Sequence, residues 1–224
     1  MIDFARVRRM MIDNQLRTYD ITDLGILSTM NEVPRERFVP DPLRDLSYTD
    51  RSLEVAGPES AEGARHLLPP MIFARLLQNL AIRHGEKVLV VGGGLGYEAV
   101  VIARQGARVV VREPDPALAE RTRANLAEHG AGAVVVSIGP MAEGCPEEAP
   151  FDAILVNGAV QVRPRALLEQ LVDGGRLGAI VGDGSRTSRA SVFVRSHDAF
   201  GARAVFDAAA PVLAPFREEP GFVF

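Results

Sequence analysis

The stretch that decides the fold is Val88-Leu89-Val90-Val91-Gly92-Gly93-Gly94-Leu95-Gly96-Tyr97. Its first half belongs to a short, continuous apolar run that predicts a buried parallel strand over residues 87–91. Its second half is rich in glycine and leads into a segment, residues 97–104, that we expect to be helical. Glycine permits a tight turn and a close approach of ligand to backbone, and a helix N-terminus offers free amides. A strand, a glycine turn and a helix in this order predict a nucleotide-type ligand site.

The spacing of the glycines narrows the class of ligand. A dinucleotide fingerprint, G-x-G-x-x-G, beginning at Gly92 would need a glycine at position 97, which is Tyr97. Gly92, Gly94 and Gly96 instead form G-x-G-x-G, which suits a nucleoside with an amino-acid tail better than a pyrophosphate. We therefore expect Gly92, Gly94, Gly96 and Tyr97 to bind the cofactor.

Segments with strand and helix patterns alternate on the C-terminal side of this turn. The strands are expected at residues 108–112, 134–138, 153–156 and 176–181. The helices are expected at residues 115–129, with Asp115 as cap and Gly130 as stop, and at residues 165–172. This alternation predicts a parallel sheet covered on both faces. Two further strands, residues 190–195 and 203–206, have no helix between them and predict an antiparallel pair at the edge of the sheet.

The first 65 residues lack this regular alternation of strands and helices. We expect them to form a helical extension that packs on the core, which is residues 66–224, within a single domain. We predict a first helix capped by Asp3. A second helix, capped by Thr22 or Asp23, should end near Met30 and carry Leu24, Leu27 and Met30 on one side.

Two irregular segments complete this extension. The stretch Val33–Pro40 has a proline near each end and is expected to be an extended connector. Residues 57–65 are the most loop-like part of the chain, and they are either a mobile lid or a plain surface loop.

Two polar residues are expected beside the glycine turn. Glu113 follows the strand at 108–112, which places its carboxylate at the carboxyl edge next to the turn, where it can accept both ribose hydroxyls of an adenosine. The alternative is a structural pairing of Glu113 with Arg112 or with a helix. Asn157, at the end of the strand at 153–156, is expected to face the same crevice.

Composition excludes several other functions. The net charge of −4 gives no electrostatic reason to expect nucleic acid or an anionic membrane as a partner. The lone Cys145 excludes an intramolecular disulfide, and four scattered histidines do not have the spacing of metal ligands. No secretory signal and no apolar run of about 20 residues is present. We expect a cytoplasmic protein without a metal site.

Several motifs resemble the protein-L-isoaspartate O-methyltransferase family. Residues 11–16, Met-Ile-Asp-Asn-Gln-Leu, are similar to the family's N-terminal helix M-V-x-x-Q-L. Residues 33–40, Val-Pro-Arg-Glu-Arg-Phe-Val-Pro, are similar to its V-P-R-E-x-F-V-P connector, and Tyr48-x-Asp50 follows as expected. Further matches lie at residues 149–154 and 168–177. The connector and the last segment are the specific matches, since the glycine turn alone would fit many methyltransferases.

The resemblance implies a Rossmann-like class I methyltransferase with a seven-stranded sheet, S-adenosylmethionine as cofactor, and a protein or peptide as substrate. It implies methyl transfer to the carboxylate of isoaspartyl residues in damaged proteins, a protein-repair reaction. Because that carboxylate is already ionised at neutral pH, alignment and exclusion of water matter more than a general base. No catalytic residue is therefore singled out.

The chain departs from the family at three places. Leu68 stands where the family has the serine of T-I-S-Q-P, and Val90 stands where an acid usually ends the first strand. Pro140-Met141 replaces the aspartate and second glycine of G-D-G, so that Met141 is expected near the adenine. Three hypotheses remain: an isoaspartyl methyltransferase with altered site residues, a methyltransferase for a different acceptor, and an inactive binding module.

Overall fold

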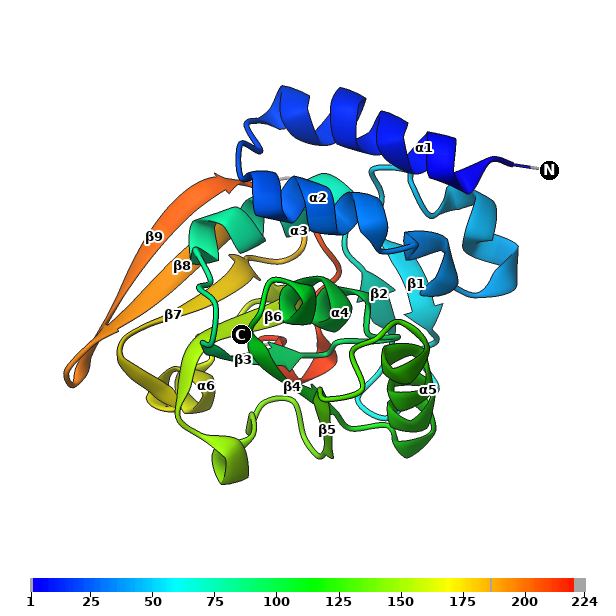
Figure 1. Ribbon diagram of the computed structural model, residues 1–224. Coiled ribbons are helices and arrows are strands. Elements are labelled where there is room, and N and C mark those ends of the chain that lie inside the picture. The colour runs from blue at the N-terminus through cyan, green and yellow to red at the C-terminus, as the bar shows by residue number, and fades with distance from the viewer. Residues whose placement is uncertain (1, 186, 220–224) are drawn as a thin grey trace, which may run out of the picture.

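The computed structural model describes residues 2–185 and 187–219 as one α/β unit (Figure 1). The helices are α1 (Phe4–Met11), α2 (Leu24–Glu32), α3 (Pro70–Leu80), α4 (Tyr97–Arg104), α5 (Pro116–Glu128) and α6 (Arg165–Glu169). The strands are β1 (Leu53–Ala56), β2 (Arg65–Leu67), β3 (Lys87–Val91), β4 (Arg108–Glu113), β5 (Val135–Ile138), β6 (Phe151–Val160), β7 (Leu171–Val181), β8 (Arg189–Ser196) and β9 (Ala199–Asp207).

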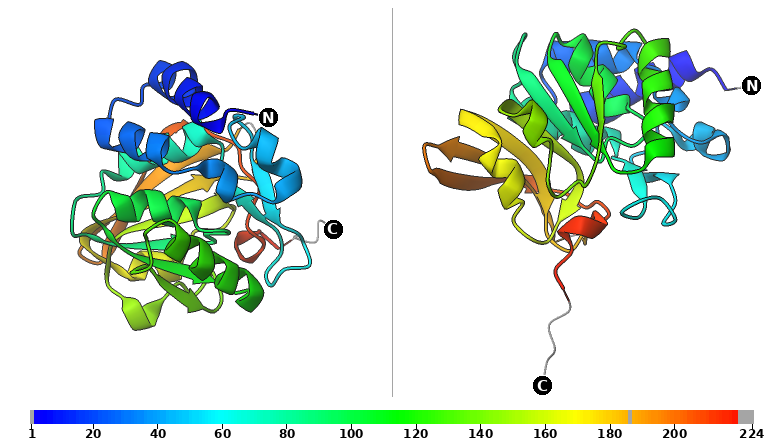
Figure 2. Two further views of the ribbon diagram at one scale, coloured as in Figure 1. Left: turned by 45° about the vertical axis from the view of Figure 1, so that its right-hand side comes forward. Right: turned by 90° about the horizontal axis from the view of Figure 1, so that it is seen from below.

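Seven strands form the main sheet in the order β5-β4-β3-β6-β7-β8-β9. The strands from β5 to β7 pair in parallel, and β8 runs antiparallel to both β7 and β9. The seven-stranded sheet with an antiparallel edge pair is thus confirmed, and β8 and β9 lie on the side of the molecule opposite α5 (Figure 2). The strand order reverses between β3 and β6, and in open α/β sheets the ligand crevice lies outside the carboxyl ends of the strands at such a switch point.

The central strands are apolar on both faces because both faces are covered. Val88 and Val90 of β3 belong to a large core with helices α1 to α5, whereas Leu89 and Val91 belong to a second core. That second core contains α6, the irregular segment after β5 and the chain near Phe216. One face is therefore covered by helices and the other mainly by short or irregular segments.

Side-chain caps start three helices where the sequence predicts them. The carboxylates of Asp3, Asp23 and Asp115 accept hydrogen bonds from backbone amides of the first turns of α1, α2 and α5. Gly130, with φ of +72°, follows the end of α5 as expected.

Two expectations for the N-terminal extension are wrong. Leu24 is 72% exposed, because α2 begins there and buries Ile26, Leu27 and Met30 instead. The segment 33–40 is not extended throughout: it contains a 3₁₀ turn at Arg35–Arg37. This turn places Arg35 inside the molecule, where its guanidinium donates to the carbonyls of Ser47 and Leu68.

A third difference concerns the helix expected at residues 165–172. α6 ends at Glu169, and β7 begins at Leu171, so that Gly174 and Gly175 lie inside the strand. Pairing with β6 shifts from Phe151↔Leu171 to Ala153↔Arg176. The glycines form this bulge, with Gly174 at φ of +77°, a conformation that favours glycine.

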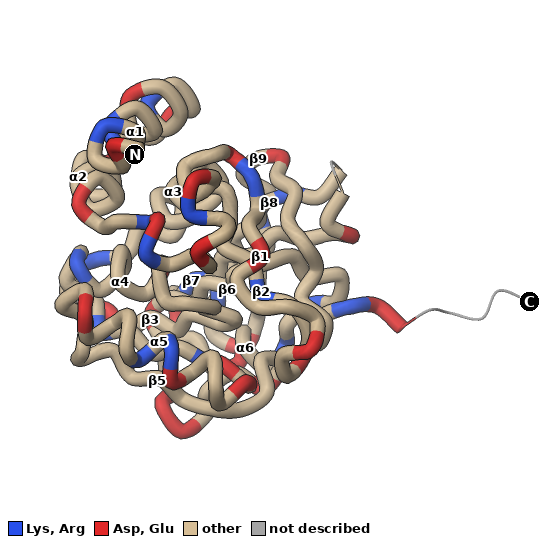
Figure 3. The backbone as a smooth tube through the Cα atoms, turned by 90° about the vertical axis from the view of Figure 1, so that its right-hand side faces the viewer, with Lys and Arg blue, Asp and Glu red and all other residues tan. Residues whose placement is uncertain are grey.

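Within residues 2–185 and 187–219, no helix combines the length and the hydropathy needed to cross a bilayer. Acidic and basic residues are interspersed along the chain in Figure 3.

Candidate functional site

The glycine turn between β3 and α4 has the backbone geometry that its sequence predicts. Gly92, Gly94 and Gly96 have φ of +70°, +52° and +94°, and Gly96 is the N-cap of α4. Since side chains strain such conformations, glycine is favoured at these three positions. We call Gly92–Tyr97 together with Glu113 the glycine corner.

Glu113 ends β4 beside the turn, and its carboxylate is held by an arginine of the same chain. Nη2 and Nε of Arg65 lie 2.9 and 3.2 Å from the two carboxylate oxygens. Both side chains have an exposed fraction of 0%. Burial raises the pKa of Glu113, and the adjacent guanidinium opposes that rise by favouring the ionised form.

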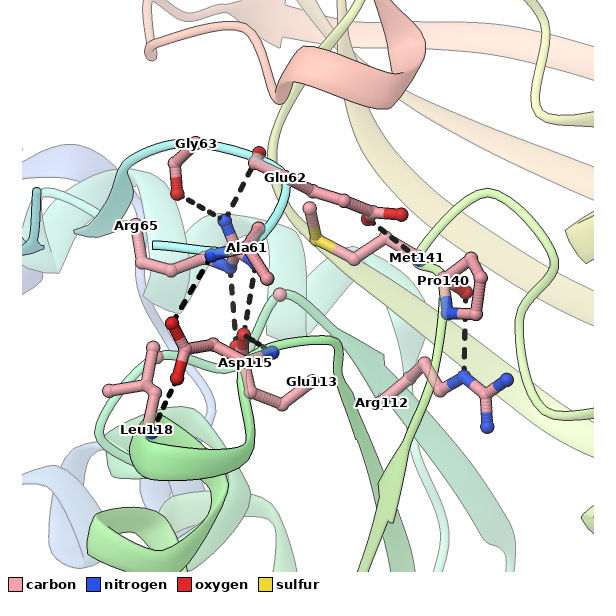
Figure 4. Close-up of polar contacts among 12 residues, drawn as sticks. Ala61, Glu62, Gly63, Arg65, Arg112, Glu113, Asp115, Leu118, Pro140 and Met141 are labelled. Atoms are coloured by element: carbon pink, nitrogen blue, oxygen red, sulfur yellow. Dashed lines mark hydrogen bonds and ion pairs between the residues drawn. The ribbon is translucent and has the colours of Figure 1, made fainter. Parts of the chain in front are cut away.

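Arg65 also holds the segment that covers the corner, residues 57–65, which we call the covering loop. Its guanidinium donates to the carbonyls of Ala61 and Gly63 at 2.7 Å each (Figure 4). The carboxylate of Glu62 in turn accepts a hydrogen bond from the amide of Met141, 3.0 Å away. The covering loop therefore joins β4 to the segment that follows β5.

Apolar side chains fill the space against the glycines. A β-carbon on Gly92 would lie 3.1 Å from Sδ of Met141 and 3.4 Å from Cδ1 of Leu213. A β-carbon on Gly94 would lie 3.0 Å from Cγ2 of Val55. Met141 is thus next to the turn, as expected, but it packs against the turn as part of the core.

Asn157 lies at the switch point. Its Nδ2 donates to the carbonyls of Gly92 and His66, each 3.1 Å away, and so ties β6 to the turn and to β2. Its Oδ1 is buried and has no hydrogen-bond partner in the described part of the chain. A buried acceptor without a donor is uncommon in folded proteins.

Tyr97 contributes only its backbone to the corner. Its ring lies in the core, with centroids 5.6 Å from Phe38 and 5.8 Å from Phe73, and the Arg35 guanidinium lies 5.0 Å from its centroid. The structure therefore brings Gly92, Glu113, Met141 and Asn157 together, as the sequence predicts, and directs the Tyr97 side chain elsewhere.

The three residues that differ from the family's pattern are Leu68, Val90 and Pro140. Leu68 and Val90 have exposed fractions of 0%, and the Leu68 carbonyl accepts from Arg35. The carbonyl of Pro140 accepts a 3.4 Å hydrogen bond from Nε of Arg112. None of these three side chains offers a polar group to a cofactor.

A buried acid adjoins the Leu68 segment. Glu98 of α4 has an exposed fraction of 0%, and neither of its oxygens has a hydrogen-bond partner among the residues described. Burial raises the pKa of Glu98 to about 7, although the charge of Arg35 opposes the rise.

Cys145 and His66 are two further side chains of reactive type, and the structure gives each an ordinary structural environment. Cys145 is buried, and burial raises the pKa of its thiol, which makes it a poor nucleophile. His66 lies in β2 with its Nε2 3.9 Å from a carboxylate oxygen of Glu54. Groups of three or more metal-ligating side chains are absent from the residues that the structure describes.

The residues present do not fit S-adenosylmethionine in this arrangement. A ribose at Glu113 needs the carboxylate oxygens that Arg65 occupies, and the turn is packed against Val55, Met141 and Leu213. Sequence reasoning missed Arg65, because an arginine after a Gly- and Glu-rich loop is usually solvated. Leu67 and Leu68, which follow it directly, are the signal that the chain enters the core there.

Comparison with known proteins agrees with the fold. The family described as Protein-L-isoaspartate(D-aspartate) O-methyltransferase matches residues 6–208. A protein-L-isoaspartate O-methyltransferase of Methylorubrum populi is 43% identical over 182 residues, which are 81% of this chain and 82% of the relative. The enzyme of the same name from Methanoculleus marisnigri is 40% identical over 177 residues, 79% of this chain and 78% of the relative.

Solved structures show the same architecture. A protein-L-isoaspartate O-methyltransferase superposes with a TM-score of 0.76 at 25% identity, covering 92% of this chain and 64% of that one. A Plasmodium falciparum structure of this name, in complex with S-adenosyl-L-homocysteine, gives a TM-score of 0.76 at 19% identity and covers 92% and 97% of the two chains. The match over most of the chain, with identities of 40% and more, means that this protein belongs to the protein-L-isoaspartate O-methyltransferase family of S-adenosylmethionine-dependent methyltransferases.

Proposed function

We propose that this protein transfers a methyl group from S-adenosylmethionine to the free carboxylate of isoaspartyl residues in cytoplasmic proteins or peptides. The observation that carries the proposal is the family match over residues 6–208, which includes the glycine turn and Glu113 at the end of β4. We infer that residues 1–224 act as one domain, since β1 of the N-terminal extension pairs with β2 at the start of the core.

The residues proposed to bind the cofactor are those of the corner. Backbone groups of Gly92, Gly94, Gly96 and Tyr97 would contact it, Glu113 would accept from the ribose, and Asn157 would offer Oδ1. Met141 would lie beside the adenine. These roles require an arrangement in which Glu113 is released from Arg65.

The acceptor chemistry fits a site without a general base. An isoaspartyl carboxylate is ionised at neutral pH, so the chain has to align it and exclude water. Leu68 contributes no hydroxyl for that alignment, which leaves the acceptor contacts to backbone groups or to other side chains.

The experiment uses two peptides of one sequence that differ in a single residue, isoaspartate or aspartate. The full chain is incubated with S-adenosylmethionine labelled in its methyl group, and base-labile methyl ester is counted. Label on the isoaspartyl peptide alone supports the proposal. Equal label on both peptides, or label on another acceptor only, would assign a different substrate. No label on any acceptor contradicts the proposed activity.

A further inference from the structure

The covering loop is fixed to two neighbouring elements, the start of α5 and the segment that follows β5. The amide of Ala61 donates to Oδ2 of Asp115, 3.2 Å away, at the start of α5. Glu62 accepts from the amide of Met141 at 3.0 Å, on the segment after β5. The loop thus bridges the carboxyl ends of β4 and β5, above the carboxylate that a ribose would use (Figure 4).

Arg65 uses its full hydrogen-bonding capacity inside this bridge. A guanidinium has five N–H donors, and those of Arg65 make five hydrogen bonds: two to the carboxylate of Glu113 and three to the carbonyls of Ala61, Glu62 and Gly63. The side chain therefore holds the loop that precedes it and the acid beneath it at once. Such saturation is what allows a guanidinium to be buried completely.

The backbone at the tip of the loop is strained. Glu62 has φ of +59°, a left-handed conformation that a non-glycine residue seldom adopts, and Gly63 follows with φ of +83°. The two residues turn the chain back so that its carbonyls face the guanidinium. Since the turn is held against this local preference, the contacts of Arg65 and Glu62 keep the loop closed.

Arg65 and a ribose would compete for one acceptor. The carboxylate of Glu113 is fully buried and accepts from the guanidinium on both oxygens and from the amide of Asp115 on one. No solvent-facing acceptor site is left for a ribose, so bound adenosine and the closed loop exclude each other. We propose that Arg65 is a tethered internal competitor that sets the affinity of the cofactor site, and that the cofactor binds only after Arg65 and residues 61–64 withdraw from Glu113. The proposal rests on the proposed function only for the identity of the ligand.

The physical consequence is a weakened apparent affinity. When the binding-competent form is a minor fraction of the molecules, the apparent Kd rises in inverse proportion to that fraction. Weakening the closed form therefore strengthens binding without any new contact to the ligand.

The test measures S-adenosylhomocysteine binding by calorimetry to the wild type and to R65Q. We expect R65Q to bind at least roughly tenfold more tightly, because the glutamine cannot pair with both oxygens of Glu113. The matched control is R176Q: Arg176 also binds a carboxylate, that of Glu86, and the carbonyls of Leu80 and Ala81, but at the amino end of the strands. R176Q is expected to bind like the wild type.

A second variant covers the case in which R65Q does not fold. E62A removes the carboxylate that anchors the loop to Met141 and leaves the buried pair intact. We expect it to bind several-fold more tightly than the wild type. In hydrogen exchange, amides of residues 57–65 of the wild type should exchange faster when S-adenosylhomocysteine is bound.

The proposal is overturned if neither variant binds more tightly than the wild type, or if the ligand leaves exchange of residues 57–65 unchanged. The binding and exchange measurements do not depend on whether the protein methylates isoaspartyl residues. Variants that bind S-adenosylhomocysteine tightly yet methylate no isoaspartyl peptide would refute the proposed substrate while supporting the role of Arg65.

Discussion

Arg65 and Glu113 form a two-bonded ion pair, with N–O distances of 2.9 and 3.2 Å, that has no contact with solvent. The arginine precedes the core strands by a whole helix, and the acid ends the second strand of the sheet. This pair couples stability to ligand binding, because the two Glu113 oxygens that hold Arg65 are also the ones proposed to bind the ribose.

Removing the acid should destabilise the protein strongly. E113A leaves the guanidinium buried without its counter-charge, and we expect a loss of about 3–5 kcal/mol in the free energy of unfolding. Urea denaturation measures it. The control is R189A, which breaks the exposed ion pair with Asp207 and should cost about 1 kcal/mol or less. A loss for E113A as small as that of R189A would show that the pair is open in solution.

Glu98 should make stability fall as pH rises through the neutral range. Its pKa is raised by burial from 4.5 to about 7, so the folded chain holds this proton more tightly than the unfolded chain does. Stability from Glu98 is therefore present at low pH and is lost between about pH 4.5 and 7, by up to about 3 kcal/mol at 1.4 kcal/mol per pKa unit.

The variant E98Q isolates this effect, because its amide stays neutral at every pH. The difference in unfolding free energy between E98Q and the wild type should move in favour of E98Q from pH 5 to pH 8. Urea titrations at several pH values measure this difference. A constant difference over that range would mean that Glu98 titrates at its ordinary value.

Restoring the family's hydroxyl at position 68 should raise isoaspartyl methyl transfer. L68S places a donor and acceptor in the segment that precedes α3, at a cost of about 2–5 kcal/mol for the buried leucine side chain. L68A has nearly the same cavity without the hydroxyl and is the matched control. We expect L68S to be several-fold more active than L68A in the peptide assay, and equal activity would locate the acceptor elsewhere.

Gly92 should tolerate no side chain, for two separable reasons. G92A meets Met141 and Leu213 and also requires φ of +70°, so we expect a loss of about 2–4 kcal/mol in thermal or urea unfolding. G130A has the same backbone problem, φ of +72°, with no atom within 4 Å of the added carbon. Its expected cost is about 1 kcal/mol. Similar losses for the two variants would show that the turn is loosely packed.

The sequence alone determined the elements whose signals are local. Asp115 before Pro116, the glycines at 92, 94 and 96, and the apolar run of β3 each act through neighbouring residues, and the structure has them as predicted. The parallel sheet and its antiparallel edge pair followed from the same alternation, whereas the order of the strands came from the structure. Leu24 and the glycines at 174 and 175 were misjudged because which face is buried, and where a strand bulges, depend on the partner strand or helix.

Only the tertiary structure decided the state of the candidate site. Glu113 was placed correctly at the edge of the turn, yet its partner, Arg65, lies 48 residues away in a stretch that looks like a solvated loop. Local patterns carry no information about which charge will meet which across the fold, because that depends on how β1, β2 and the covering loop pack on the sheet. The same holds for Tyr97, whose ring turns into the core because Phe38 and Phe73 surround it there.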